Sequence, residues 1–111
     1  MFQSLSAQEF SEKMYDEDVI VVDVRAPEEH HYFWVLPKVD LYINMYEENF
    51  FDELWKLDRN KKYFIYCRHA NRTAFLLNYM KNAGFENVVD LAGWTDGWLD
   101  AGYELVSKEF L

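Results

Sequence analysis

Short apolar runs alternate with segments of helical periodicity along the whole chain. The expected strands are Phe2–Leu5, Val19–Val22, Leu41–Met45, Tyr63–Tyr66 and Val88–Leu91. Val19–Val22 shows no alternation of apolar and polar residues, which is typical of a strand buried on both faces of a parallel sheet. Because strand and helix patterns alternate throughout, the sequence predicts an α/β fold with a mainly parallel central sheet and helices on both faces.

Four expected helices accompany these strands. Ser6 to Glu9 form a capping box that opens the first helix. The second helix spans Glu47–Leu57, the third follows Arg72, and the fourth covers Trp94–Ala101. Helical spacing and apolar character select the side chains expected to be buried: Phe10, Met14, Phe51, Leu54, Trp55, Phe75, Leu76, Tyr79, Met80, Trp94, Trp98 and the loop residues from Phe33 to Leu36.

The only cysteine of the chain, Cys67, lies directly after an expected strand and shortly before an expected helix. The first turn of a helix presents unpaired backbone N–H groups and the positive end of the helix dipole, and both stabilise a thiolate. Arg68 and Arg72 add positive charge close by. We therefore expect the pKa of the Cys67 thiol to be lowered, and we expect the turn to bind an anion.

A second polar feature, Asp23-Val24-Arg25, ends the buried strand Val19–Val22. Active sites in parallel α/β folds gather at the carboxyl ends of the strands. Asp23 and Cys67 both follow strands, so we expect them at the same edge of the sheet. Asp23 and Arg25 are expected to form a structural ion pair that fixes the loop, rather than an acid–base pair.

The segment around the cysteine resembles the active-site loop of rhodanese-like sulfurtransferases. The pattern of that family is Cys, two variable residues, Gly, one variable residue, Arg, and then Ser or Thr. This chain matches the pattern at Cys67, Arg72 and Thr73. It has Ala70 where the family usually has glycine.

Two further segments resemble the same family, in the same order along the chain. Val19–Glu29 is similar to the early strand that ends in Asp-Val-Arg followed by a Glu. Val88–Tyr103 is similar to the late strand, glycine turn and Trp-containing helix, with matches at Gly93, Trp98 and Gly102. Three motifs in order are much more specific than the loop alone.

The resemblance implies a single rhodanese-like domain over residues 1–111, with sulfur transfer as its function. The Cys67 thiolate would attack the sulfane sulfur of a donor such as thiosulfate and become a persulfide. Cyanide, a thiol or a partner protein would then take the sulfur. The implied substrate-binding residues are Arg68, His69, Ala70, Asn71 and Arg72, and the supporting residues are Asp23, Arg25 and Thr73. No metal or organic cofactor is implied, and His30, His31, His69 and Cys67 lack a clean metal-ligand spacing.

Departures from the family pattern leave two alternatives open. Ala70, Trp94 in place of a usual glycine, and the altered segment 33–40 fit a non-catalytic module that binds a protein partner. A phosphatase or arsenate reductase of related fold is the other alternative. Those enzymes have a loop one residue longer than the four residues between Cys67 and Arg72, so the loop length favours sulfur chemistry.

The composition limits the partners and the cellular location that we expect. The formal net charge of −9 argues against nucleic acid or an anionic membrane as a main partner. No apolar run approaches the length that spans a bilayer, and the first residues lack the basic start and apolar stretch of a secretory signal. With one cysteine no internal disulfide can form, and a reducing cytoplasmic location is expected.

Overall fold

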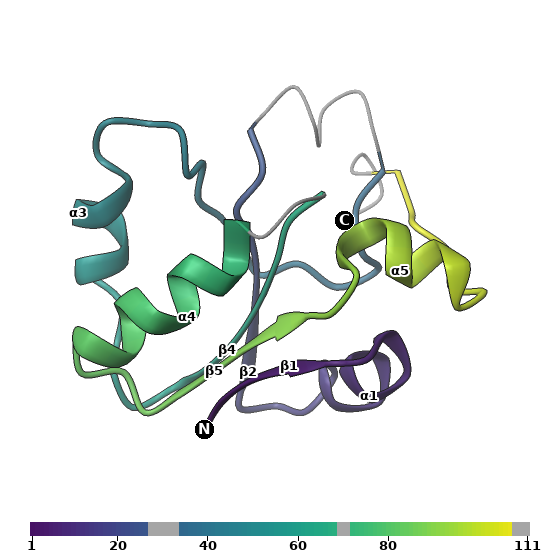
Figure 1. Ribbon diagram of the computed structural model, residues 1–111, viewed down its shortest axis with the longest axis horizontal. Helices are drawn as coiled ribbons and strands as arrows, with labels where there is room; N and C mark the ends of the chain where they lie inside the picture. The colour runs from purple at the N-terminus through teal and green to yellow at the C-terminus, as the bar shows by residue number, and fades with distance from the viewer. Residues whose placement is uncertain (27–33, 69–71, 108–111) are drawn as a thin grey trace.

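Five parallel strands form the sheet at the centre of the molecule (Figure 1). The computed structural model describes residues 1–26, 34–68 and 72–107. In chain order the strands are β1 (Phe2–Leu5), β2 (Val19–Asp23), β3 (Leu41–Tyr42), β4 (Lys62–Tyr66) and β5 (Asn87–Leu91). Their order in the sheet is β1-β5-β4-β2-β3, and every neighbouring pair is parallel, which confirms the predicted parallel sheet.

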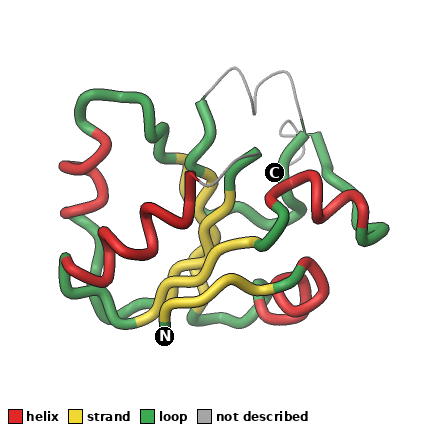
Figure 2. The backbone as a smooth tube through the Cα atoms, in the orientation of Figure 1, coloured by secondary structure: helices red, strands yellow, loops and turns green. Residues whose placement is uncertain are grey.

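Helices cover both faces of the sheet (Figures 1 and 2). α3 (Phe50–Trp55) and α4 (Arg72–Asn82) lie on one face, and α1 (Ala7–Lys13) and α5 (Trp94–Asp100) lie on the other. The predicted cap of α1 is present, because the Ser6 hydroxyl accepts the backbone N–H of Glu9 at 3.2 Å. None of the helices in the described ranges is long and apolar enough to cross a membrane.

The two faces have separate apolar cores. Under α1 and α5, the Phe10 ring lies 5.0 Å from that of Phe64 and 6.4 Å from that of Trp98. Under α3 and α4, the core is built mainly of aliphatic side chains, and it includes the following residues: Val22, Val24, Leu54, Ile65, Cys67, Leu76, Met80 and Val88. The cysteine is therefore part of the packed core beneath α4.

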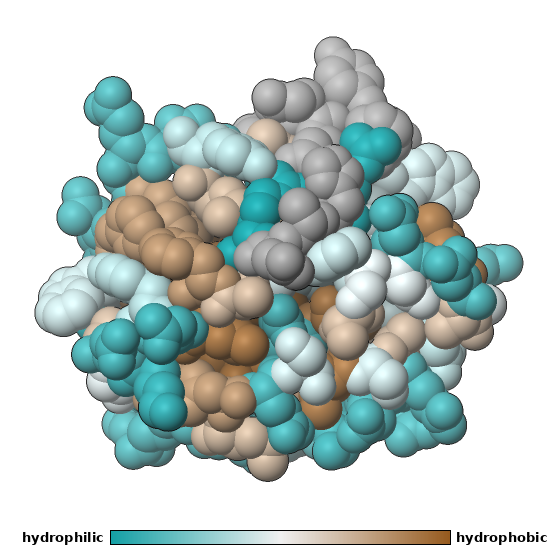
Figure 3. Space-filling view, in the orientation of Figure 1, coloured by the Kyte–Doolittle hydropathy of each residue, from teal (hydrophilic) through white to brown (hydrophobic). Residues whose placement is uncertain are grey.

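Several side chains that were predicted to be buried are exposed. α3 buries Phe50 and Leu54, which lie four residues apart, so Phe51 and Trp55 point outward. Phe75 is also exposed, and the Phe51 ring packs on that of Tyr79 at 4.7 Å. Figure 3 shows an apolar area, coloured brown, on the surface over α3 and α4. The predicted helix, Glu47–Leu57, was longer than α3, and Phe50 takes the inward position that was predicted for Phe51.

The tryptophans also differ from one another in burial. Trp98 is fully buried as predicted, whereas Trp94 is only partly buried. Trp34 is exposed, while Val35 and Leu36, which follow it, are buried. The prediction of a buried loop was therefore wrong for Trp34.

Candidate active site

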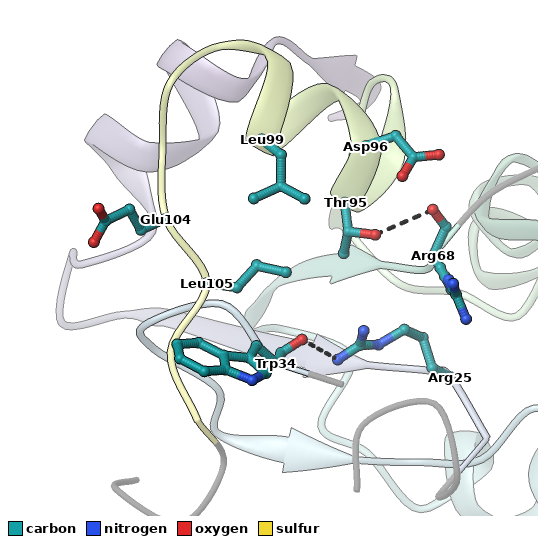
Figure 4. A pocket seen from close by; sticks show the side chains of 8 residues that line it. All are labelled: Arg25, Trp34, Arg68, Thr95, Asp96, Leu99, Glu104 and Leu105. Carbon is teal, nitrogen blue, oxygen red and sulfur yellow. Dashed lines mark hydrogen bonds between the residues drawn. The ribbon is translucent and has the colours of Figure 1, made fainter. Parts of the chain in front are cut away.

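The turn after β4 is fixed by the first turn of α5. Cys67 follows the last residue of β4, and its carbonyl accepts the backbone N–H of Thr95 at 3.2 Å. The Thr95 hydroxyl donates to the carbonyl of Arg68 at 3.1 Å (Figure 4). Two consecutive carbonyls are thus held by one residue of α5, and this places the cysteine at the carboxyl end of the sheet.

The sulfur of Cys67 is buried in the core beneath α4. The Oγ1 atom of Thr73 lies 3.9 Å from Sγ, within hydrogen-bond reach of a sulfur atom. Burial raises the pKa of the thiol, because it disfavours the charged thiolate. Hydrogen bonding with the backbone and the side chain of Thr73 and the charge of the Arg72 guanidinium lower this pKa, but burial outweighs them. The predicted lowering of the thiol pKa was therefore wrong, because the depth at which the sulfur is buried cannot be read from the residues around Cys67.

Thr73 connects the cysteine to a carboxylate on β5. The Thr73 hydroxyl donates to Asp90 Oδ2 at 2.7 Å, and the Ser4 hydroxyl donates to Asp90 Oδ1. Ser4 and Asp90 are direct partners in the pairing of β1 with β5. Sequence reasoning missed both residues, although Asp90 is the one charged residue within the apolar run Val88–Leu91.

Arg72 begins α4 and points to a residue that sequence reasoning also missed. Its Nη1 donates to the hydroxyl of Tyr46, and its guanidinium lies 5.5 Å from the centroid of the Tyr46 ring. The backbone N–H of Tyr46 is itself held by Asn44 Oδ1 at 2.9 Å. The exposed ring of Tyr46 therefore orients the Arg72 guanidinium at the start of α4.

Asp23 and Arg25 form the predicted ion pair at the end of β2. Arg25 Nη2 lies 2.7 Å from Asp23 Oδ2, and both side chains are buried. Tyr66 completes the group, because its hydroxyl donates to Asp23 Oδ2 at 2.7 Å. Burial raises the pKa of Tyr66 well above its usual value, and the nearby Asp23 charge adds to the effect. Arg25 Nη2 also donates to the carbonyl of Trp34 at 3.3 Å, so the pair anchors the loop as expected.

A cavity of about 520 Å³ opens beside the turn after Cys67 (Figure 4). Its lining carries charges of both signs and comes from four separate parts of the chain: Arg25, Trp34, Arg68, Thr95, Asp96, Leu99, Glu104 and Leu105. Because Arg25 and Arg68 line the same cavity, the ends of β2 and β4 do meet at one edge, as predicted. Arg68 brings positive charge to this cavity, Asp96 and Glu104 bring negative charge, and the charge of Arg25 is paired with Asp23.

The structure thus brings together most of the residues that sequence reasoning selected. The turn between β4 and α4 begins with Cys67 and Arg68 and leads into Arg72 and Thr73. Asp23 and Arg25 lie at the end of the neighbouring strand, β2. The other predicted site residues, His69, Ala70 and Asn71, lie outside the described residues, as do His30 and His31. Within the ranges 1–26, 34–68 and 72–107, no three His, Cys, Asp or Glu side chains gather as a metal site.

Comparisons with known proteins agree with this architecture. The family model for the rhodanese-like domain matches residues 6–101. A tRNA sulfurtransferase of Blochmanniella pennsylvanica is 32% identical over 84 residues, which is 70% of this chain, and the chain spans 16% of that protein's length. A sulfurtransferase of Allochromatium vinosum is 24% identical over 98% of this chain and 99% of its own. The crystal structure of a rhodanese-related protein from Thermoplasma volcanium has a TM-score of 0.75 at 27% identity, over 96% of this chain and 100% of its own.

Proposed function

This chain belongs to the rhodanese-like domain family, and on that premise we propose that it is a sulfurtransferase. The proposed reaction moves a sulfane sulfur from a donor anion such as thiosulfate to cyanide, a thiol or a partner protein. One observation carries the proposal. The single cysteine lies in the turn between β4 and α4, with Arg72 and Thr73 at the start of the helix that follows.

In the proposed reaction, the Cys67 thiol first gives its proton to solvent. The thiolate then attacks the sulfane sulfur of thiosulfate, the S–S bond of the donor breaks, and sulfite leaves with the bonding electron pair. An acceptor nucleophile attacks the outer sulfur of the resulting persulfide, and the Cys67 thiolate leaves. The chain has no second cysteine, so the acceptor comes from outside it.

The roles of the other residues follow from their charge and position. Arg68 and Arg72 attract the donor anion to the turn, and Tyr46 keeps Arg72 in place. His69, Ala70 and Asn71 remain the predicted contributors of the N–H groups that hold the charged persulfide. Asp23 and Arg25 support the site from β2. The proposed reaction uses no metal or organic cofactor, and the proposed location is the cytoplasm.

Intact-mass measurement tests the proposal directly. After incubation with thiosulfate, we expect the native protein to gain the mass of one sulfur, and we expect dithiothreitol to remove it. Cyanide should remove the same sulfur and yield thiocyanate. The Cys67→Ser variant, which keeps the size of the side chain, should show no gain. If thiosulfate, polysulfide and a low-molecular-weight persulfide all leave the mass unchanged, sulfur transfer is not the activity.

Burial of the cysteine favours a second candidate function. A thiol that is buried, and whose pKa is raised, is a poor nucleophile, which fits a rhodanese-like module that binds a partner without catalysis. The mass measurement separates the two functions, because the binding module gains no sulfur. The short loop between Cys67 and Arg72 disfavours phosphatase chemistry, and we expect no turnover of p-nitrophenyl phosphate.

A further inference from the structure

A hydrogen-bonded chain runs from the sulfur of Cys67 across the sheet to its edge strand. Cys67 Sγ lies 3.9 Å from Thr73 Oγ1, Thr73 donates to Asp90 at 2.7 Å, and Ser4 donates to the other carboxylate oxygen of Asp90. Ser4 and Asp90 are register partners, and Asp90 faces Ile65 on β4, one residue before the end of that strand. Four elements, β1, β5, α4 and the end of β4, are needed to build this chain.

The protons in the chain can be assigned from chemistry. A carboxylate only accepts hydrogen bonds, so the Thr73 hydroxyl must direct its single proton to Asp90. Thr73 Oγ1 then has only lone pairs left for the sulfur. It can accept a proton from the neutral thiol, but it cannot donate to the thiolate while it donates to Asp90. A Thr73 hydroxyl that donates to the sulfur lowers the thiol pKa, and the Asp90 carboxylate competes with the sulfur for that one proton.

The charge of Asp90 is unusual for its position. The side chain is 4% exposed, and among residues 1–26, 34–68 and 72–107 its hydrogen-bond partners are two hydroxyls and no cation. A buried carboxylate without a cation is costly, whereas a neutral asparagine could satisfy the same two hydroxyls. Hydrogen bonding to the two hydroxyls therefore does not explain why this residue carries a negative charge. Control of the direction of the Thr73 hydroxyl proton does explain it.

We propose that Asp90 is a positioning residue that acts on Cys67 through Thr73, holding the cysteine as a neutral thiol at rest. The other charged groups near the sulfur act differently. Arg72 at the start of α4 favours the thiolate, Arg68 follows the cysteine in the chain, and on β2 the charge of Asp23 is paired with Arg25. Asp90 thus opposes Arg72 and acts in the same direction as the burial of the sulfur. This inference deepens the proposed sulfur transfer and rests on it.

The test measures the thiol directly and needs no sulfur donor. The rate of alkylation of Cys67 by iodoacetamide is recorded against pH for the native protein and for Asp90→Asn. The substitution removes the negative charge and lets the amide donate to Thr73, which frees the Thr73 hydroxyl for the sulfur. We expect the alkylation midpoint to fall by roughly one pH unit. An unchanged or higher midpoint overturns the proposal.

A double-mutant cycle shows whether the effect passes through Thr73. In the background of Thr73→Val, which has the same shape but no hydroxyl, the Asp90→Asn shift should shrink to less than about half. A shift of equal size in both backgrounds would mean that Asp90 acts on the sulfur directly, and the positioning role would be lost. Asp16→Asn, which removes an exposed charge outside the hydrogen-bonded chain, should leave the midpoint unchanged.

The two experiments distinguish a failure of the positioning role from a failure of the proposed sulfur transfer. If Asp90→Asn lowers the midpoint and thiosulfate adds no mass to the native protein, the positioning role stands and the proposed function fails. If thiosulfate adds the sulfur and the midpoint stays where it was, the proposed function stands and the positioning role fails. Melting temperatures verify folding of each variant. Asp90→Ser removes the same charge with a smaller side chain, and it replaces Asp90→Asn should the latter not fold.

Discussion

Two buried carboxylates lie near the carboxyl ends of neighbouring strands, and they are compensated in opposite ways. The Asp23 cluster consists of Asp23, Arg25 and Tyr66, and its negative charge is paired with a guanidinium at 2.7 Å. The Asp90 chain consists of Cys67, Thr73, Asp90 and Ser4, and its negative charge is held by hydroxyl groups. The first group is neutral as a whole, whereas the second keeps an uncompensated charge beside the nucleophile.

The difference separates a structural use of buried charge from a chemical one. An ion pair that satisfies itself can fix a loop without altering the chemistry around it, and the Asp23 cluster does this for the loop that carries Trp34. A carboxylate held only by hydroxyls determines where the protons of those hydroxyls point. Asp90 therefore influences whatever else contacts Thr73, which in this protein is the sulfur of Cys67.

The largest expected effect is on the Asp23 cluster. Arg25→Met replaces the guanidinium with an apolar chain and leaves Asp23 buried without its cation, which should lower the free energy of unfolding by about 3–5 kcal/mol. Urea denaturation at neutral pH measures the loss. The double variant Asp23→Asn/Arg25→Met removes both charges and should recover part of it. A loss below about 1 kcal/mol in the single variant would show that Asp23 does not depend on the ion pair.

Deleting one hydroxyl from each group compares them directly. Tyr66→Phe removes a donor to Asp23, which keeps Arg25, so we expect a loss of about 1–2 kcal/mol in the free energy of unfolding. Thr73→Val removes one of the two hydroxyls that hold Asp90, and we expect a loss of about 2–3 kcal/mol. The same urea titration measures both. A larger loss for Tyr66→Phe would reverse the comparison, because it would make Asp23 the less well compensated charge.

The sequence allowed prediction of the Asp23–Arg25 ion pair, but not of Tyr66 as its partner and not of the Asp90 chain. Asp23 and Arg25 are two residues apart after a clear strand, so their pairing depends only on local geometry. Ser4 and Asp90 are 86 positions apart, and their contact depends on the register of β1 against β5, which no local pattern determines. Apolar periodicity likewise predicted the order of strands and helices, since burial on a sheet requires it.

The burial depth of individual side chains was the other quantity that could not be predicted from the sequence. The position of Cys67 before a helix predicted a favoured thiolate, but the packing of the side chain beneath α4 reversed the sign. The exposed Phe51 and Trp55 have a related cause, because a helix of six residues has room for one inward row. The pairing of Arg72 with Tyr46 joins a helix to a distant loop and shows in no sequence motif.

The smallest expected effect is a pH dependence that also distinguishes the two groups. Between the ordinary thiol pKa of 9.0 and the raised pKa of Cys67, the unfolded chain has lost the thiol proton and the folded protein still binds it. Raising the pH through this interval therefore favours unfolding, and we expect stability to fall by up to about 1 kcal/mol between pH 9 and 10. Cys67→Ser should abolish this step. Tyr66, whose pKa is raised from the ordinary value of 10.0, contributes a loss of the same sign only above that pH, and Tyr66→Phe should remove it. Urea titrations at closely spaced pH values measure both steps. If the free energy of unfolding has the same slope against pH below pH 10 in the native protein and in Cys67→Ser, burial does not raise the thiol pKa. The Asp90 chain would then have no effect of this kind on the chemistry of Cys67, and the contrast with the Asp23 cluster would not hold.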